Sequence, residues 1–349
     1  MTSASPSTYG VDNNFNLLRL MFALMVAVYH ATFLPNVPEW AALEGPMSLA
    51  AEIGVQGFFV LSGYLVWSSL ERSSSLRLYA EKRVRRLYPG YATVVVICAL
   101  AALAFSPEAR ADLGAVARYL GWNLLFLNFM APNLPGVFEA NRFTEINGAL
   151  WTLKIEVMFY LILPVLALVM RAAGRFRWVL VAAIYAAAEA WRIGLEQAGQ
   201  GGEGVLIELS RQLPGQMSFF ITGVAFHMLS LRKMKLQLAG LAGAVLLLLS
   251  IFVSAAEPVR ALGLGAVSIW AATGLPRLID AARFGDLSYG LYIVHFPIIQ
   301  TIIAIGLFGQ SPALALVVSG VSALAAALVL WWLVERPALR SDSAYRAKA

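Results

Sequence analysis

Long apolar segments, repeated along the chain, constrain what this sequence can form more than any other feature. Several of them reach the ~20 residues that an α-helix needs to cross the hydrocarbon core of a bilayer. Of the 349 residues, 60% are hydrophobic and only 13% are charged. The sequence therefore predicts an all-α, polytopic membrane protein with about ten transmembrane helices.

The apolar runs place these spans within one membrane domain that occupies residues 1–349. The first twelve residues contain no Lys or Arg, and a long apolar run follows them, which indicates a transmembrane helix and not a signal peptide. The helical bundle extends over residues 13–334, and residues 335–349 form a short basic cytoplasmic tail. The predicted spans are 13–34, 52–70, 90–106, 150–170, 177–195, 213–230, 236–254, 258–277, 286–307 and 312–334.

The distribution of charge orients these spans. With a cytoplasmic N-terminus, the segments on the cytoplasmic side hold most of the Lys and Arg, while the opposite loops hold several acids, as the positive-inside rule requires. The net charge of +6 is therefore an orientation signal, and we expect no nucleic-acid partner. The inner basic residues include Arg83, Arg85, Arg86, Arg171, Arg175, Arg177, Arg232, Lys233 and Lys235.

Two segments are predicted not to span. Residues 71–89 form a basic amphipathic stretch, which we interpret as a helix lying on the inner surface and held by anionic headgroups. The long outer loop 107–149 contains a semi-apolar piece, 119–130, that is short for a span. We interpret this piece as a re-entrant or interface-lying helix, because counting it as a span would invert the charge pattern downstream.

Arg19 and His30 are the most unusual residues within the spans. Eleven positions make about three helical turns, so both side chains point the same way, roughly 16 Å apart along the axis. An arginine at membrane depth costs roughly 2.5–3.5 kcal/mol, which indicates a polar site or path. A neutral imidazole at His30 suits a general base, and a guanidinium at Arg19 suits an anionic or carbonyl-bearing ligand from the cytoplasm.

Other ionisable residues in the spans have competing interpretations. Glu156, about two turns from the outer end of its span, requires a partner or a proton-linked role. His295 fits a buried structural histidine and a functional one equally well. Arg192 lies near an outer helix end, where its side chain is expected to snorkel to the interface. Taken alone, this arrangement fits a proton-coupled transporter or an enzyme that bridges two compartments.

The second span, GVQGFFVLSGYLV (54–66), carries small residues among aromatics. Small residues allow close helix packing, and they also let a bulky ligand pass near the backbone. Ser62 is a weak candidate for a covalent nucleophile, because no histidine is its neighbour in sequence. The single cysteine, Cys98, excludes an internal disulfide, and we expect no metal site.

Together these segments resemble the acyltransferase-3 family of integral membrane acyltransferases, which modify cell-surface carbohydrates. The resemblance covers more than 300 residues in order. It rests on Arg19 and His30, which are separated by ten residues, and on five motifs. The motifs are GVQGFFVLSGYL, KRVRRLYP, WTLKIEVMFYLILP, LSYGLYIVHFPI and VERP at 334–337.

The resemblance implies transfer of an acyl group, usually acetyl, from cytoplasmic acetyl-CoA to a hydroxyl of a polysaccharide or its lipid-linked precursor. Carried over by position, Arg19 and His30 are the expected essential pair, and Arg83 and Arg86 match arginines that help to hold the donor. With Lys82 and Arg85 they form a cluster suited to the phosphates of CoA.

Glu156 is the third expected catalytic residue, as the group that orients His30 or as an anchor for the acceptor. We expect Trp151, His295, Tyr64, Ser62 and Asn123 to contact substrate. The outer loop 107–149, with Trp122, Asn123, Asn141 and Arg142, is the expected acceptor-recognition surface.

The chain ends at Ala349, so it resembles the stand-alone form of the family and not relatives with a C-terminal hydrolase-like domain. We expect it in the bacterial cytoplasmic membrane, with both termini inside. One alternative is a proton-coupled transporter of a small anion that uses Arg19, His30 and Glu156 as a relay. Another is a non-catalytic scaffold, which leaves the intramembrane charges unexplained.

Overall fold

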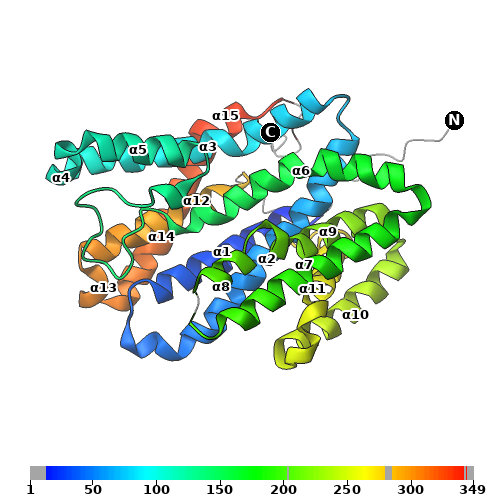
Figure 1. The fold of residues 1–349 in the computed structure, drawn as a ribbon. Coiled ribbons are helices and arrows are strands. Elements are labelled where there is room, and N and C mark those ends of the chain that lie inside the picture. Colours follow the sequence, from blue (N-terminus) through cyan, green and yellow to red (C-terminus); the bar gives the residue numbers. More distant parts are fainter. Residues whose placement is uncertain (1–12, 203, 280–284, 342, 344–349) are drawn as a thin grey trace.

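Ten long helices carry the architecture of the computed structural model, which describes residues 13–202, 204–279, 285–341 and 343 (Figure 1). One helix falls in each predicted span, and no strand occurs in these ranges. The ten are α1 (Phe15–Phe33), α2 (Glu44–Glu71), α3 (Leu76–Phe105), α6 (Trp151–Ala173), α7 (Arg177–Gly199), α9 (Leu213–Leu229), α10 (Lys233–Phe252), α11 (Arg260–Thr273), α12 (Leu287–Ala304) and α14 (Pro312–Leu330).

Shorter helices and helical turns lie between these elements or follow the last of them. They are η1 (Pro38–Leu43), α4 (Pro107–Ala111), α5 (Leu113–Leu124), η2 (Asn128–Met130), η3 (Gly148–Leu150), η4 (Gly174–Phe176), α8 (Gly204–Ser210), η5 (Ser254–Val259), α13 (Leu307–Gln310), η6 (Trp331–Glu335) and α15 (Arg336–Ala338).

Length and composition support a polytopic membrane protein. Seven segments of the described chain contain helix long and apolar enough to cross a membrane, and one of them, Gly148–Gly199, includes both α6 and α7. Helices α9 and α11 are shorter, with 17 and 14 residues, and much of each is buried against neighbouring helices. The predicted all-α, polytopic fold is confirmed.

The basic stretch 71–89 is not a separate surface helix, as the sequence suggested. From Leu76 onward it is the first half of α3, which continues through Pro89 to Phe105. Ser75 caps this helix, since its side chain accepts a hydrogen bond from the backbone N–H of Leu78. Arg83 and Arg86 therefore sit on a long rigid helix, and both are buried against the bundle.

The predicted tail also begins inside the fold. Glu335 ends η6, a π-helical turn that continues α14, and only 2% of its side chain is exposed. Residues 1–12, and most of the tail beyond Arg340, lie outside the described residues.

Within the outer loop, the piece expected to lie in the interface is split between α5 and η2. Helix α5 has 12 residues, which is ~18 Å at 1.5 Å per residue and too short to cross a bilayer. It packs along α3 (Figure 1).

Small residues bring α2 and α9 into close contact. A Cβ on Gly63 would lie 2.0 Å from the carbonyl oxygen of Phe220, and one on Gly223 would lie 2.0 Å from that of Val60. Each glycine thus admits the backbone of the other helix, which confirms the packing role of the small residues in the second span.

Arg192 does not snorkel. Only 1% of its side chain is exposed, and its guanidinium lies 2.6 Å from Glu189, 2.7 Å from Glu257 and 3.4 Å from Glu196. These carboxylates come from α7 and η5, so the arginine is held in the interior by ion pairs and not drawn to the interface.

Candidate active site

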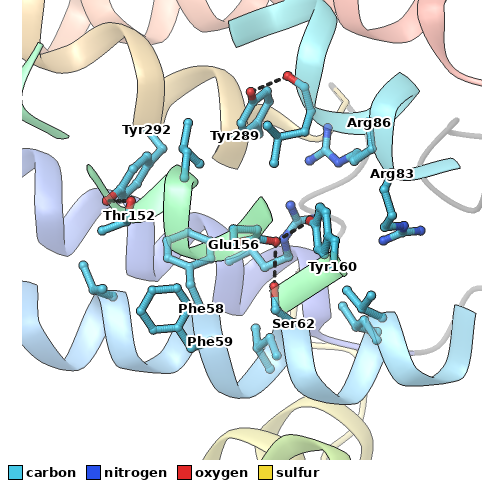
Figure 2. A pocket seen from close by; sticks show the side chains of 17 residues that line it. Phe58, Phe59, Ser62, Arg83, Arg86, Thr152, Glu156, Tyr160, Tyr289 and Tyr292 are labelled. Atoms are coloured by element: carbon cyan, nitrogen blue, oxygen red, sulfur yellow. Dashed lines mark hydrogen bonds between the residues drawn. The ribbon is translucent and has the colours of Figure 1, made fainter. Parts of the chain in front are cut away.

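A cavity lies between α1, α2, α3, α6 and α12, at the junction of two apolar cores (Figure 2). One core is centred on α3, α12 and α14, and the other on α2, α6 and α9. Apolar side chains such as Phe58 and Phe59 form much of the wall, and polar groups gather in three places. Arginines occupy one end, a carboxylate the middle, and hydroxyl groups the other end.

At the arginine end, Asp286 holds two guanidinium groups together. Its Oδ2 lies 2.6 Å from Arg19 Nη1 and 2.6 Å from Arg86 Nη2. The other arm of Arg86 reaches Glu335 Oε2 at 2.9 Å. Arg86, Asp286 and Glu335 are at most 5% exposed, so the cluster is an interior ion network that ties α1, α3 and the start of α12 to η6.

Arg83 completes this end of the cavity. It lies one turn before Arg86 on the same face of α3, donates to Ser69 Oγ at 3.1 Å, and places its guanidinium 5.7 Å from the ring centre of Tyr160. Three guanidinium groups (Arg19, Arg83 and Arg86) thus line one end of the cavity. This end of the cavity is suited to an anion.

The other two predicted donor residues do not line the cavity. Arg85 pairs with Glu81 at 2.8 Å on the exposed side of α3, and its side chain is 48% exposed. Lys82 Nζ lies 3.4 Å from Ser73 Oγ. Because α3 is helical here, positions 83 and 86 share the inward face while 82 and 85 do not.

In the middle of the cavity, Glu156 accepts two hydrogen bonds. Ser62 Oγ donates to its Oε1 at 2.7 Å, and the hydroxyl of Tyr160 donates to the same oxygen (Figure 2). The partner that Glu156 was expected to need is therefore a pair of hydroxyl groups from α2 and α6. Tyr160, one turn after Glu156, was missed by the sequence analysis.

His30 pairs with His295, the late histidine on α12. His30 Nδ1 lies 2.9 Å from His295 Nε2, and His295 Nδ1 lies 3.0 Å from the carbonyl oxygen of Leu291. A carbonyl only accepts, so His295 Nδ1 donates, and its Nε2 in the neutral ring accepts the proton of His30 Nδ1. This assignment leaves His30 Nε2 with a lone pair, as a general base requires.

His295 is thus the group positioned to orient His30, a role that was predicted for Glu156. The hydrogen bonds of Glu156 within the described chain go to Ser62 and Tyr160. Its other predicted role, as an anchor for the acceptor, stays a prediction.

Tyr292 separates the histidine pair from the cavity. Its hydroxyl lies 2.7 Å from Thr152 Oγ1, and its ring meets Phe58 and His295 edge to face. Asp286, Tyr289, Tyr292 and His295 recur every three residues, so one stripe of α12 connects the arginine end to the histidines.

Besides His295, three predicted substrate contacts lie away from the cavity wall. Tyr64 packs against Phe15 and His227, with ring centres 5.5 and 5.0 Å away. The buried amide of Asn123 donates to the carbonyls of Tyr119 and Ala131, where it holds the end of α5. Trp151 begins α6 and is partly buried against the apolar core around α2.

In the outer loop, the side chains of Asn141 and Arg142 bond to other elements. Asn141 donates to the carbonyl and the side-chain oxygen of Gln300. Arg142 donates to the carbonyl of Phe33. The loop is thereby tied to α1 and α12. Within the described residues, no group of three or more His, Cys, Asp or Glu is placed to hold a metal ion.

Asp286 and Glu335 were not found from the sequence. Both lie at ends of predicted spans that the charge pattern assigns to the cytoplasm, where acids are few, and a buried arginine requires a carboxylate partner. The need of Arg19 and Arg86 for carboxylate partners is the sequence signal that could have led to Asp286 and Glu335.

The helical bundle thus encloses a mainly apolar cavity with arginines at one end, and the comparisons give the class of the protein. Residues 12–333 match the acyltransferase-3 family model, described as an acyltransferase domain. The chain belongs to this family, and it is an acyltransferase. No solved structure matches it.

Similar proteins include two that align over almost their whole length. Nodulation protein 10 of Rhizobium leguminosarum bv. viciae is 28% identical over 97% of this chain and 96% of its own. An O-acetyl transferase of Shigella phage Sf6 is 26% identical over 95% of this chain and 97% of its own. Peptidoglycan O-acetyltransferase OatA of Listeria monocytogenes is 32% identical over 44% of this chain and 23% of its own.

Proposed function

We propose that this membrane O-acyltransferase moves an acetyl group from cytoplasmic acetyl-CoA to a hydroxyl of an extracytoplasmic or lipid-linked polysaccharide. The observation that carries the proposal is the polarity of the site. Guanidinium groups gather at one end of the cavity, and an imidazole with an available lone pair lies beyond the other end. The names of the similar O-acetyltransferases support an O-acetyl product.

The arginine end is the proposed donor site. Arg83 and Arg86 on α3, with Arg19 on α1, present guanidinium groups that suit the phosphates of CoA. The predominantly apolar wall beyond them suits the donor's flexible arm, which would carry the thioester past Glu156 toward Tyr292. Arg85 and Lys82 lie outside the cavity, and their positive charges would attract the same anion toward it.

His30 is the proposed general base. Its Nε2 takes the proton of the acceptor hydroxyl as the oxygen attacks the thioester carbonyl. When the tetrahedral intermediate collapses, the C–S bond breaks, and the proton on His30 passes to the departing thiolate. His295 accepts the Nδ1–H of His30 throughout, which fixes the tautomer and stabilises the imidazolium.

We propose the remaining assignments on the same grounds. The bundle 13–334 acts as one acyltransferase domain in the bacterial cytoplasmic membrane, with both termini inside. Acyl-CoA, a carbohydrate acceptor and the bilayer are its partners. Glu156 is the proposed acceptor anchor, and the loop 107–149 is the proposed recognition surface.

Transfer of labelled acetyl from acetyl-CoA tests the proposal. Purified protein in liposomes should release CoA when supplied with an acceptor, and His30→Ala should lower the rate by about 10²–10⁴-fold, the usual contribution of a general base. Absence of acetyl-CoA binding, together with solute flux driven by a pH gradient, would instead support the transporter.

A further inference from the structure

A second, open pocket lies at the turn between α6 and α7, outside the proposed active site. It is lined by Met170, Arg171, Gly174, Arg175, Arg177 and Trp178. The turn lies at the same end of the bundle as the connection between α9 and α10 (Figure 1). Both connections belong to the side that the charge pattern assigns to the cytoplasm.

The backbone of Gly174 gathers three arginines around this pocket. Gly174 has φ +52° and ψ −115°, a conformation that residues with a Cβ rarely adopt, and it ends α6. Arg171 lies in the last turn of α6, Arg175 in η4, and Arg177 at the first residue of α7. The reversal therefore brings guanidinium groups from three successive elements to one pocket.

These guanidinium groups differ from the other clustered arginines of the protein. Arg19, Arg86, Arg192 and Arg260 are all ion-paired within the fold. Within the described chain, by contrast, neither a hydrogen bond nor an ion pair engages Arg171, Arg175 or Arg177. Three guanidinium groups that make no ion pair in the described chain provide strong, multidentate donors for a phosphate group at one pocket.

Glu71, the carboxylate that interacts electrostatically with Arg171, is hydrogen-bonded to other side chains. Glu71 feels the charge of Arg171, but its oxygens bond Trp67 Nε1 at 2.9 Å and His227 Nε2 at 3.0 Å. The positive charge of the pocket is therefore left for a group from outside the protein.

Apolar side chains next to the pocket indicate the source of that group. Phe176 is 57% exposed and Val179 is 65% exposed, and Leu168, two turns earlier, is 66% exposed. Trp178 forms part of the wall and is of the type enriched at membrane interfaces. Cations beside exposed apolar groups match a lipid, with its phosphate at the arginines and its chains along the helices.

We propose that this pocket binds the phosphate of an anionic phospholipid in the cytoplasmic leaflet. The proposal rests on the proposed orientation of the bundle but not on the proposed reaction. Basic loops are attracted to anionic membranes in general. The proposal is more specific, because it places one bound lipid phosphate at Arg171, Arg175 and Arg177 and none at the other basic residues of the same side.

Native mass spectrometry of the full-length protein tests this, with phosphatidylglycerol and phosphatidylcholine supplied in equal amounts. The wild type should retain phosphatidylglycerol preferentially. The variant Arg171→Gln/Arg175→Gln/Arg177→Gln should lose at least about tenfold of that binding, since each cation near the surface contributes to headgroup attraction. A matched control, Arg232→Gln/Lys233→Gln/Lys235→Gln, removes the same charge from the α9–α10 connection and should keep it.

A second variant separates geometry from charge and guards against misfolding. Replacing the three pocket arginines by lysine keeps the charge but removes the planar, bidentate donors, and we expect an intermediate loss of phosphatidylglycerol. Equal losses in the pocket and control variants would overturn the proposal in favour of diffuse attraction. No preference in the wild type would overturn it too, as would full displacement of the lipid by inorganic phosphate, which would identify a site for free anions. Acetyl transfer, measured in parallel, reports separately on the proposed reaction.

Discussion

His30 donates its Nδ1 proton to Nε2 of His295, across 2.9 Å between α1 and α12. The carbonyl of Leu291 fixes the direction of this bond, because it accepts the single N–H of the neutral His295 ring and leaves Nε2 as an acceptor. The proposed base is thus oriented by a second imidazole and not by a carboxylate.

Replacing His295 should slow catalysis without weakening donor binding. In His295→Ala, the Nδ1–H of His30 loses its acceptor, so the tautomer and ring orientation are no longer fixed. We expect the rate of acetyl transfer to fall by about 10–100-fold, the range found when a partner that orients a metal-bound histidine is lost. Single-turnover kinetics measure the rate, and acetyl-CoA affinity should stay unchanged. A wild-type rate would contradict the assigned role.

Arg83 and Arg85 form a matched pair for donor binding. Both are arginines on α3, but only Arg83 lines the cavity, while Arg85 is half exposed. Arg83→Gln should weaken acetyl-CoA binding by roughly 10–100-fold, which corresponds to the loss of one charged hydrogen bond. Arg85→Gln should change it by less than about threefold, as expected for an exposed charge. Calorimetry with purified protein distinguishes the two, and equal effects would place the donor outside the cavity.

Asp286 should be essential for stability at the arginine end of the cavity. Asp286→Asn removes the carboxylate that Arg19 and Arg86 share, so that each buried guanidinium group loses one charged partner. Breaking a buried ion pair in this way costs about 3–5 kcal/mol. Thermal unfolding in detergent should show a clearly lowered Tm. Unchanged stability would mean that the pairs are replaced by water.

Ser62 tests whether transfer is direct. Ser62→Ala removes one of two donors to Glu156, and Tyr160 still donates to the same oxygen. Direct transfer therefore predicts a loss of no more than about tenfold, the value of one hydrogen bond. Complete loss in Ser62→Ala, with an acetyl adduct on Ser62 of the wild type by mass spectrometry, would show an acyl-enzyme instead.

Arg192 is expected to matter for folding alone. Arg192→Met leaves Glu189, Glu196 and Glu257 without their shared cation, at a cost of about 3–5 kcal/mol. The arginine does not line the cavity, so the folded fraction should bind acetyl-CoA normally. Urea unfolding monitors stability, and reduced donor affinity in the folded fraction would indicate a functional link.

The apolar pattern predicted the ten helices well because burial in lipid requires long apolar runs. It did not predict that residues 76–89 form the first half of α3, because a charged helix at the membrane surface and the start of a longer helix have the same composition. Arg19, His30, Arg83, Arg86 and Glu156 were each named as candidates from the sequence. Among their partners, His295 and Ser62 were also named, but Asp286, Glu335 and Tyr160 were not, because the contacts of these residues depend on how the helices pack.

Helix α1 meets α12 at two levels, through Arg19 with Asp286 and through His30 with His295. The numbering rises in the same direction along both helices, so the two contacts hold them in a single register. One inserted residue between Arg19 and His30 would rotate His30 by about 100° relative to Arg19. The apolar residues between them should tolerate exchange for others of similar volume, but the length of that segment should tolerate neither insertion nor deletion.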